Sequence, residues 1–410
     1  MSILIRRRKS IVFTSEQINI PHESHLKIFL RFLRFGFLAW GGPVAQIAMI
    51  RHELVDEEKW ISSERFNRVL AVYQVLPGPE AHEICVYFGM LAGGRIGAFL
   101  AGLAFMTPGF LLMFALSWFY VTYGINSPIF QSVFLGMQPA VAALIVRAVH
   151  RIGGHALQAN KWLWSLAFLA GFAQLLRINF LITLLTVGFV YAFAERQKIR
   201  FAFTLAIAFV FSIIYFNFGI SLSTVTFSTD GVTETATTDL VSLFASGLRA
   251  GLLTFGGAYT AIPFIQHDAV EVGHWLTNAQ FLDGLALSGL LPAPLIIFST
   301  FVGYLGGGPL GAIALTVGIF LPAFAFTIIG HDYLEKLIEN KSAHAFLDGV
   351  TAGVVGLIAA TALGILSETI LGLNAWIIFS LALLTLFLSK SKWTVAWVVA
   401  AAGLFGLFFL

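Results

Sequence analysis

The chain has 410 residues, of which 58% are hydrophobic and 11% are charged, and its net charge is +3. Soluble domains carry about 25% charged residues, so this composition excludes a soluble protein and predicts one embedded in a lipid bilayer. The single cysteine, Cys85, excludes an internal disulfide. His and Cys do not cluster with metal-ligand spacing, so we expect no metal, no cofactor and no nucleic-acid partner.

Apolar segments long enough to cross a bilayer occur along the whole chain. A helix needs about 20 apolar residues to cross a hydrocarbon core about 30 Å thick. The predicted fold class is therefore an all-α polytopic membrane protein with about 13 membrane segments. In chain order these are 28–50, 64–92, 96–123, 128–147, 162–177, 178–194, 200–220, 240–264, 278–303, 309–330, 345–367, 373–388 and 393–410.

The sequence also divides into domains. Residues 1–25 are basic and lack an apolar signal core and a cleavage site, so we expect a tail that is retained in the cytosol. Residues 221–239 are rich in Ser and Thr and contain no Lys or Arg, which is typical of a linker. They separate an N-terminal transporter repeat, 26–220, from a C-terminal transporter repeat, 240–410.

The two halves share a repeated sequence. Residues 33–79 recur at 248–294 without a gap, and 17 of the 47 paired positions are identical. Duplication, with Gly and Pro inside the apolar segments, is typical of secondary transporters. The identical pairs include Arg34/Arg249, His52/His267, Trp60/Trp275, Pro77/Pro292 and Pro79/Pro294, and a shift of one residue adds Gly89/Gly303, Gly93/Gly307, Gly94/Gly308, Gly97/Gly311 and Pro108/Pro322.

The positions of Lys and Arg predict the side of the membrane that each loop faces. Cytosolic loops are richer in these residues, so we place the N-terminus in the cytosol. The basic stretch 51–68 fits only if segments 28–50 and 64–92 bend back as re-entrant hairpins; the alternative is that both segments span. In either case an odd number of segments precedes the second repeat, so we expect two homologous repeats in inverted topology. The basic loops on the cytosolic side are 147–161, 195–200, 331–341 and 389–392.

Glycine and proline predict four breaks in the membrane helices. Proline removes a backbone donor and clashes with the preceding turn, and unpaired backbone in lipid costs several kcal/mol, so such breaks must be buried in protein or line water. The N–H groups of each half-helix then point into the gap and favour an anion. The alternative is that the glycines only permit close packing and the prolines only kink. The candidate substrate-binding breaks are Gly41-Gly42-Pro43, Pro77-Gly78-Pro79, Gly256-Gly257 and Pro292-Ala293-Pro294.

Ionisable residues lie close to these breaks. Arg34 and Arg249 each precede a glycine pair by seven residues. A charged Arg inside the membrane costs about 2.5–3.5 kcal/mol, so we predict that they neutralise a bound dianion; the alternative for Arg34 is that it snorkels to the headgroups. Glu80, His82 and Glu83 follow Pro79. The acids suit a helix N-terminus, or one of the three takes up a proton when the anion binds.

Several ordered motifs resemble the chromate transporter family of the long, two-domain type. The resemblance covers roughly residues 28–365. It implies an inner-membrane protein that exports chromate, built from two oppositely oriented halves, with sulfate as a structural mimic of the substrate. The motifs are GGPVAQ at 41–46, LPGPEA at 76–81, GGRIGAFLAGLAFMTPG at 93–109, TFGGAY at 254–259, LPAPLIIFSTFVGYLGG at 291–307 and HAFLDGVTAGVVGLIAATAL at 344–363.

The predicted function is therefore export of chromate, a tetrahedral oxyanion, driven by proton antiport or by the membrane potential. Moving one charge through 100 mV is worth about 2.3 kcal/mol, so a dianion gains about 4.6 kcal/mol on leaving a negative interior. A transporter of sulfate or another oxyanion and a small-anion channel are the alternatives. We expect no enzyme, because the sequence has no flavin, haem or metal motif that would support a reductase. A homodimer is compatible with this architecture.

Overall fold

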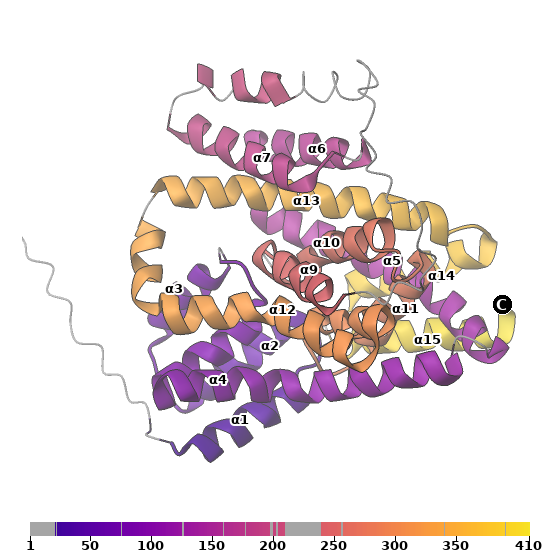
Figure 1. The fold of residues 1–410 in the computed structure, drawn as a ribbon, viewed down its shortest axis with the longest axis horizontal. Coiled ribbons are helices and arrows are strands. Elements are labelled where there is room, and N and C mark those ends of the chain that lie inside the picture. Colours follow the sequence, from indigo (N-terminus) through magenta and orange to yellow (C-terminus); the bar gives the residue numbers. More distant parts are fainter. Residues whose placement is uncertain are drawn as a thin grey trace, which may run out of the picture.

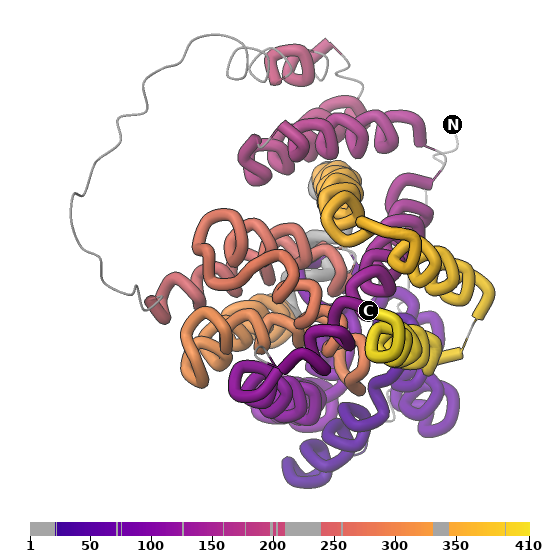
Figure 2. Tube along the Cα trace, turned by 90° about the vertical axis from the view of Figure 1, so that its right-hand side faces the viewer, coloured from indigo at the N-terminus to yellow at the C-terminus, as the bar shows by residue number. Residues whose placement is uncertain are grey.

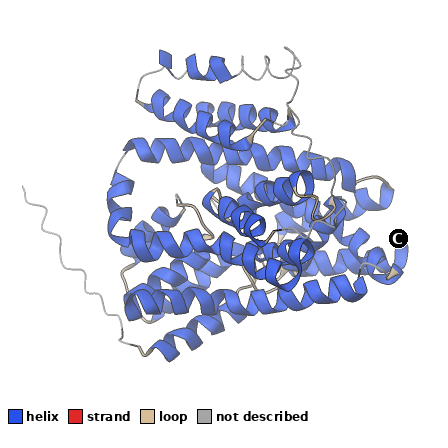
Figure 3. Ribbon diagram, viewed as in Figure 1, coloured by secondary structure: helices blue, strands red, loops and turns tan. Residues whose placement is uncertain are grey.

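The computed structural model describes most of the chain, and Figure 3 shows helices and loops with no strand among the described residues. Four of its helices are long and apolar enough to cross a membrane, as expected for an all-helical membrane protein. The tail 1–20, the linker 221–238, Gly256 and most of segment 200–220 lie outside the described residues, so the domain limits and the total number of segments stay predictions. The described residues are 21, 23–74, 76–124, 127–158, 160–176, 178–196, 200–201, 204–209, 239–255, 257–339, 341–389 and 391–410.

Both copies of the repeat contain the same series of elements. A helix is followed by a break, a second helical stretch that ends in π-helical turns, a third helix, a second break and a long bent helix. In the first copy these are α1 (His25–Phe37), α2 (Gly42–Arg51), η1 (His52–Glu57), α3 (Ser63–Tyr73) and α4 (Glu80–Phe119), followed by η2 (Tyr120–Gly124). In the second copy they are α9 (Leu240–Leu252), η3 (Ala258–Ala261), α10 (Ile262–Gln266), η4 (His267–Val272), α11 (Asn278–Gly289), η5 (Leu295–Ile297) and α12 (Phe298–Glu339).

The remaining described helices lie where apolar segments were predicted, with two differences at their ends. The stretch 147–161 was expected to be a loop, but α5 continues through most of it, to Ala156. The stretch 331–341 is likewise mostly helix, because α12 continues to Glu339. A helix continues until its backbone is capped, whereas an apolar segment ends at the first charges. These helices are α5 (Pro128–Ala156), α6 (Lys161–Leu175), α7 (Phe180–Glu195), α13 (Lys341–Thr369), α14 (Leu373–Leu388) and α15 (Thr394–Phe409).

Helix α4 is a hairpin of two helical arms. Gly94 adopts φ 62° and ψ −155°, which is outside the helical region. A methyl group added to Gly89 would lie 2.5 Å from the carbonyl oxygen of Gly97. Residues eight apart in a straight helix are separated by about 12 Å, so the chain must reverse between them. The first arm, 80–92, therefore packs against the second arm, 95–119, through two glycines.

The second copy repeats this hairpin in detail. Gly308 in α12 has φ 62° and ψ −154°, nearly the same values as its counterpart in α4. A methyl group on Gly303 would lie 2.4 Å from the carbonyl oxygen of Gly311. These four contact glycines are the ones that the repeat preserves, which explains why the sequence match continues past the proline breaks. The long apolar stretches in α4 and α12 therefore each contain a reversal.

Each copy also folds back at its two breaks. Arg34 of α1 pairs with Glu53 of η1, which follows the first break. The ring centroids of Phe66 in α3 and Phe88 in α4 lie 6.3 Å apart across the second break. In the second copy, Phe281 and Phe298 are 5.5 Å apart in the same way. Segments 28–50 and 64–92 thus have the folded-back geometry that the re-entrant hypothesis requires, and not that of straight spanning helices.

The two copies pack against each other through α4 and α12, which both lie in the lower half of the molecule in Figure 1. A methyl group on Gly78 would lie 3.2 Å from Ala323 Cβ, and one on Gly109 would lie 2.4 Å from Ala293 Cβ. Gly78 matches Ala293 in the repeat, and Gly109 matches Ala323. The same contact is thus made twice with the copies exchanged. Helices α13, α7 and α6 stack beside this centre, and Figure 2 looks nearly along several of the bundled helices.

The glycine contact inside the hairpins makes a testable prediction. Gly89→Ala and Gly303→Ala each place a methyl group against a backbone carbonyl that cannot move aside, and overpacking of this kind costs about 1–3 kcal/mol. We expect a lower apparent Tm in detergent and a lower abundance in membranes. Gly154→Ala in α5 is the control, because a methyl group there meets nothing within 4 Å. Equal apparent Tm values for all three variants would contradict the hairpin packing.

Candidate functional site

The predicted breaks are places where the backbone leaves the helical conformation. Gly41 is the N-cap of α2 with φ 89°, and no side chain caps the N–H groups that follow it. Gly42 has φ 78° and Gly257 has φ 116°, values that favour glycine because it lacks a Cβ. Pro79 is the N-cap of α4, and Pro294 is the N-cap of η5. Each break thus precedes the start of a helix.

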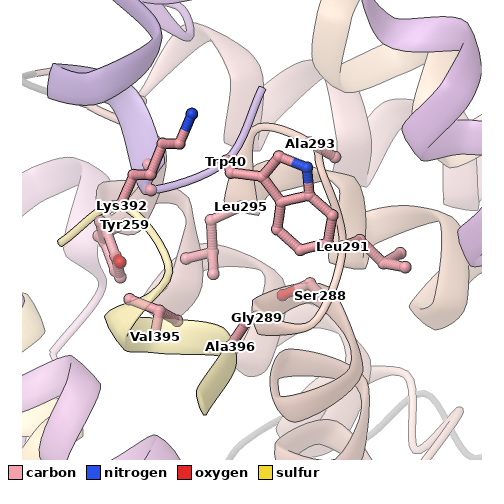
Figure 4. Close-up of a pocket in the computed structure, with 12 residues that line it drawn as sticks. Trp40, Tyr259, Ser288, Gly289, Leu291, Ala293, Leu295, Lys392, Val395 and Ala396 are labelled. Atoms are coloured by element: carbon pink, nitrogen blue, oxygen red, sulfur yellow. The ribbon is translucent and has the colours of Figure 1, made fainter. Parts of the chain in front are cut away.

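The first break of each copy lies against the second break of the other copy. The N–H of Gly78, in the second break of the first copy, donates to the carbonyl oxygen of Thr254, beside the first break of the second copy, at 2.8 Å. Conversely, Gly41 and Gly42 line a cavity of about 30 Å³ together with Leu291, Ala293 and Leu295 of the other copy (Figure 4). A water molecule needs about 10–15 Å³ of such volume, so this space is too small for a tetrahedral oxyanion.

A larger cavity of about 340 Å³ adjoins the small one and shares Gly41, Tyr259, Lys392 and Val395 with it. Three cations line it, two from α5 and one from the turn before α15. Figure 4 shows that Lys392 and Tyr259 lie on the same side of the small cavity, away from Leu291. The residues around the larger cavity are Gly41, Val44, Ala45, Ala48, Leu144, Arg147, Ala148, Arg151, Tyr259, Ser391, Lys392 and Val395.

The charged residues that line this cavity are all positive. Arg147 and Arg151 are four residues apart on one helix, where like charges repel. The guanidinium carbon of Arg151 lies 5.4 Å from the ring centre of Tyr259, and the same charge acts on the carboxylate of Glu80. None of the described residues forms an ion pair with Arg147, Arg151 or Lys392, and none of the residues that line the cavity is acidic. The cavity thus attracts anions.

Sequence reasoning missed these three cations because it placed them in loops. Arg147 and Arg151 begin a stretch that was expected to follow a membrane segment, and Lys392 belongs to the basic stretch 389–392. The spacing of four residues was the available signal, since it puts two arginines on one face of a helix. The spacing indicates a shared face only if the stretch is helical, and this stretch was expected to be a loop.

The structure places Arg34 and Arg249 elsewhere. Arg34 pairs with Glu53, and Arg249 pairs with the buried carboxylate of Asp268, which also accepts a 2.7 Å hydrogen bond from Ser246. Neither arginine lines the cavity. Each acid directly follows the repeated histidine of its own copy. The matched arginines therefore tie the first helix of each copy to its π-helical turns, a contact from which we predict a structural role.

The three ionisable residues after Pro79 have different surroundings. Glu80 starts α4 and is partly exposed, whereas His82 and Glu83 are fully buried. The His82 ring packs edge-on against Phe320 at 5.0 Å and Phe324 at 4.7 Å. Neither carboxylate oxygen of Glu83 has a hydrogen-bond partner among the described residues. This site belongs to one copy only, because the other continues with apolar residues 295–298.

Comparison with known proteins identifies the family. The family model described as "Chromate transporter" matches residues 26–194 and 241–407. The chain belongs to the chromate transporter family. A protein of Pseudomonas aeruginosa described as "Chromate transport protein" is 54% identical over 408 residues, which cover 98% of this chain and 96% of the relative. The resemblance predicted from the ordered motifs is confirmed, and the chain is an integral membrane protein.

More distant relatives of the family include one of similar length and one that is much shorter. A "Chromate transport protein" of Cupriavidus metallidurans is 30% identical over 394 residues, 94% of each chain. A shorter Bacillus subtilis protein, described as an uncharacterized transporter, is 30% identical over 139 residues, 34% of this chain and 78% of its own length. No solved structure matches the chain.

The two matched arginines should differ in how much they contribute to the stability of the protein. Arg249→Gln leaves the buried carboxylate of Asp268 with only Ser246 as a described partner, whereas Glu53 keeps its contact with Arg31 after Arg34→Gln. We expect Arg249→Gln to lower stability by about 1–3 kcal/mol, less than a fully buried pair would lose, because the arginine is partly exposed. Arg34→Gln should cost less.

Apparent Tm values in detergent test this contrast. The double variant Arg249→Gln/Asp268→Asn should recover part of the loss, since it removes the buried charge. Equal losses for both single variants, with no recovery in the double variant, would contradict the structural role.

Proposed function

We propose that this protein exports chromate from the cytoplasm across the inner membrane and that the larger cavity binds the anion. The observation that carries the proposal is a cavity lined by three cations and no acid, at the junction of the broken helices. Relatives described as chromate transport proteins cover nearly the whole chain and support the choice of substrate. A tetrahedral dianion in a low-dielectric site requires full positive charges, and this cavity supplies them.

Each group around the cavity has a distinct part in binding. Arg147 and Arg151 offer planar guanidinium groups, which bind oxyanions through paired hydrogen bonds. Lys392 adds a third charge. The start of α2 at Gly41 adds backbone N–H groups and a dipole worth about 0.3–2 kcal/mol. The charged side chains therefore provide most of the binding energy, and the backbone orients the oxyanion.

This assignment revises the site expected from the repeat. Gly41, Gly42 and Pro43 stay in it, because they open the turn that lets the start of α2 face the cavity. Pro292, Ala293 and Pro294 shape the narrow inner end, which is too small for the anion. Pro77, Gly78 and Pro79 shape the contact with the other copy. Gly257 belongs to the break beside Tyr259, and Gly256 lies outside the described residues.

We propose that the two repeats, 26–220 and 240–410, have inverted orientations, with the N-terminal tail in the cytosol. The contact between Gly78 and Ala323 recurs as that between Ala293 and Gly109. A contact that is repeated with the partners exchanged is typical of a two-fold axis. The cations that line the larger cavity come from helix ends with cytosolic charge bias, so we assign its opening to the cytosol. Outward movement of the dianion is then favoured by the membrane voltage.

Neutralising the cavity cations tests the binding site. We expect Arg147→Gln, Arg151→Gln and Lys392→Gln each to weaken chromate transport about tenfold or more, because a hydrogen bond to a charged group is worth about 1.5–3 kcal/mol. The measurement is uptake of labelled chromate into inside-out vesicles at a clamped voltage. Lys161→Gln is the matched control, since Lys161 is an exposed cation at the start of α6.

Abundance in the membrane is measured for every variant. Wild-type uptake by all three cavity variants would exclude this cavity as the anion site. Competition by excess sulfate tells whether the site distinguishes among tetrahedral dianions. Uptake that rises linearly with concentration, without saturation, would favour a channel over a transporter.

Labelling from each side of the membrane tests the orientation. Ile96 and Leu310 follow equivalent hairpin turns, and both are about 60% exposed. Single Ile96→Cys and Leu310→Cys variants should react with an impermeant thiol reagent from opposite sides, Ile96→Cys from the cytosol. The parent chain should stay unlabelled, because Cys85 is fully buried. Reaction of both variants from the same side would show that the repeats run in parallel.

A further inference from the structure

We propose that Glu83 carries a proton when the two copies are packed as in this structure, and that proton release requires α4 and α12 to separate. The inference rests on the proposed transport function, to which it adds the residue that couples protons to the movement of the repeats. It selects one group from Glu80, His82 and Glu83, and it places the proton at the contact between the copies, outside the anion cavity.

The first observation is the isolation of the Glu83 carboxyl group. Its side chain is fully buried, and neither oxygen has a hydrogen-bond partner among the described residues. An ionised carboxylate without a partner costs many kcal/mol in a low-dielectric interior, so such a group is neutral instead. The packed conformation therefore holds Glu83 as a carboxylic acid.

The second observation is that the described elements around Glu83 offer no cation to offset its charge. Tyr73 of α3 and His82 on the same helix are its titratable neighbours, and Glu80 acts on it as a like charge. On the side of α12 that packs against this region, Ala323 lies next to Gly78. Phe320 and Phe324 of the same helix contact the ring of His82. Arg151 acts on Glu80, one helical turn earlier.

The third observation is the position of Glu83 at the contact between the two copies. A methyl group on Gly78 would lie 2.8 Å from the Oε1 atom of Glu83 and 3.2 Å from Ala323 Cβ. The carboxyl group thus fills the space beside the point where α12 meets the first copy. At the corresponding contact in the other copy, the residues after Pro294 are apolar. One side of the contact can lose a proton, and the other cannot.

Protonation is therefore linked to packing. When α12 moves away from α4, water reaches Glu83 and the carboxylate can ionise. When α12 returns, the carboxylate must take up a proton before the apolar contact can close. Relative movement of two repeats is the usual basis of alternating access, so each closure of this contact binds one proton at Glu83. Glu80 lies one turn nearer to the cavity cations and connects this group with the anion site.

Glu83→Gln tests the proposal, because glutamine keeps the shape of a neutral acid and cannot release a proton. The full-length protein is reconstituted in liposomes with the voltage clamped by potassium and valinomycin. Chromate exchange is followed with a tracer, and proton movement with a trapped pH dye. We expect proton movement driven by a chromate gradient to fall at least tenfold while tracer exchange continues. Glu64→Gln, at an exposed acid of α3, is the matched control and should behave as wild type.

A second measurement uses the wild-type chain and does not depend on the folding of a variant. Dicyclohexylcarbodiimide reacts with protonated carboxyl groups in apolar surroundings. We expect mass spectrometry to find the label at Glu83 and not at the ion-paired Glu53. Wild-type proton movement in Glu83→Gln, or no label at Glu83, would overturn the inference. Chromate transport by the wild type without any proton movement would also overturn it and leave the proposed function intact, whereas a wild type that carries no chromate would refute the proposed function itself.

Discussion

One constraint governs this structure: a backbone N–H or C=O group inside a membrane must find a partner within the protein or in a water-filled cavity. Broken helices expose such groups, so breaks are stable only where other parts of the chain cover them. Gly78 meets this constraint by donating to Thr254 of the other copy, whereas Gly41 lines a cavity together with Leu291 and Ala293 of the other copy. Each copy thus covers breaks that the other would leave open, which explains why the repeat preserves Gly and Pro at these positions.

The same constraint separates the residues that build the scaffold from those that carry charge. Arginines repeated in both copies would put unpaired charge inside the membrane twice, and each copy instead provides an acid close by, Glu53 for Arg34 and Asp268 for Arg249. The charges that stay unpaired, at Arg147, Arg151 and Lys392, come from elements outside the matched repeat. The repeated residues thus form the backbone breaks of the candidate site, and residues outside the matched repeat provide its charged side chains.

Much of this fold could be predicted from the sequence, and the failures have physical causes. The breaks followed from Gly and Pro, and the folding back at residues 28–50 and 64–92 followed from the charge of the loop between them. The reversal inside α4 lies at Gly93 and Gly94, between the predicted segments 64–92 and 96–123, and the approach of Gly89 to Gly97 shows how closely its two arms pack. Arg147 and Arg151 were assigned to a loop, since hydrophobicity marks where the apolar stretch ends and not where the helix ends.

The difference between the two copies bears on the proposed transport cycle. Two identical inverted repeats would offer the same groups to both sides of the membrane, and the cycle would then have no built-in polarity. Here the residues after the second break are ionisable in one copy and apolar in the other, and three cations line a single cavity. If the repeats are inverted, as we propose, the two ends of the transport path would differ in their ionisable groups. In the proposed cycle a proton would then bind at Glu83 of one copy and at no equivalent residue of the other.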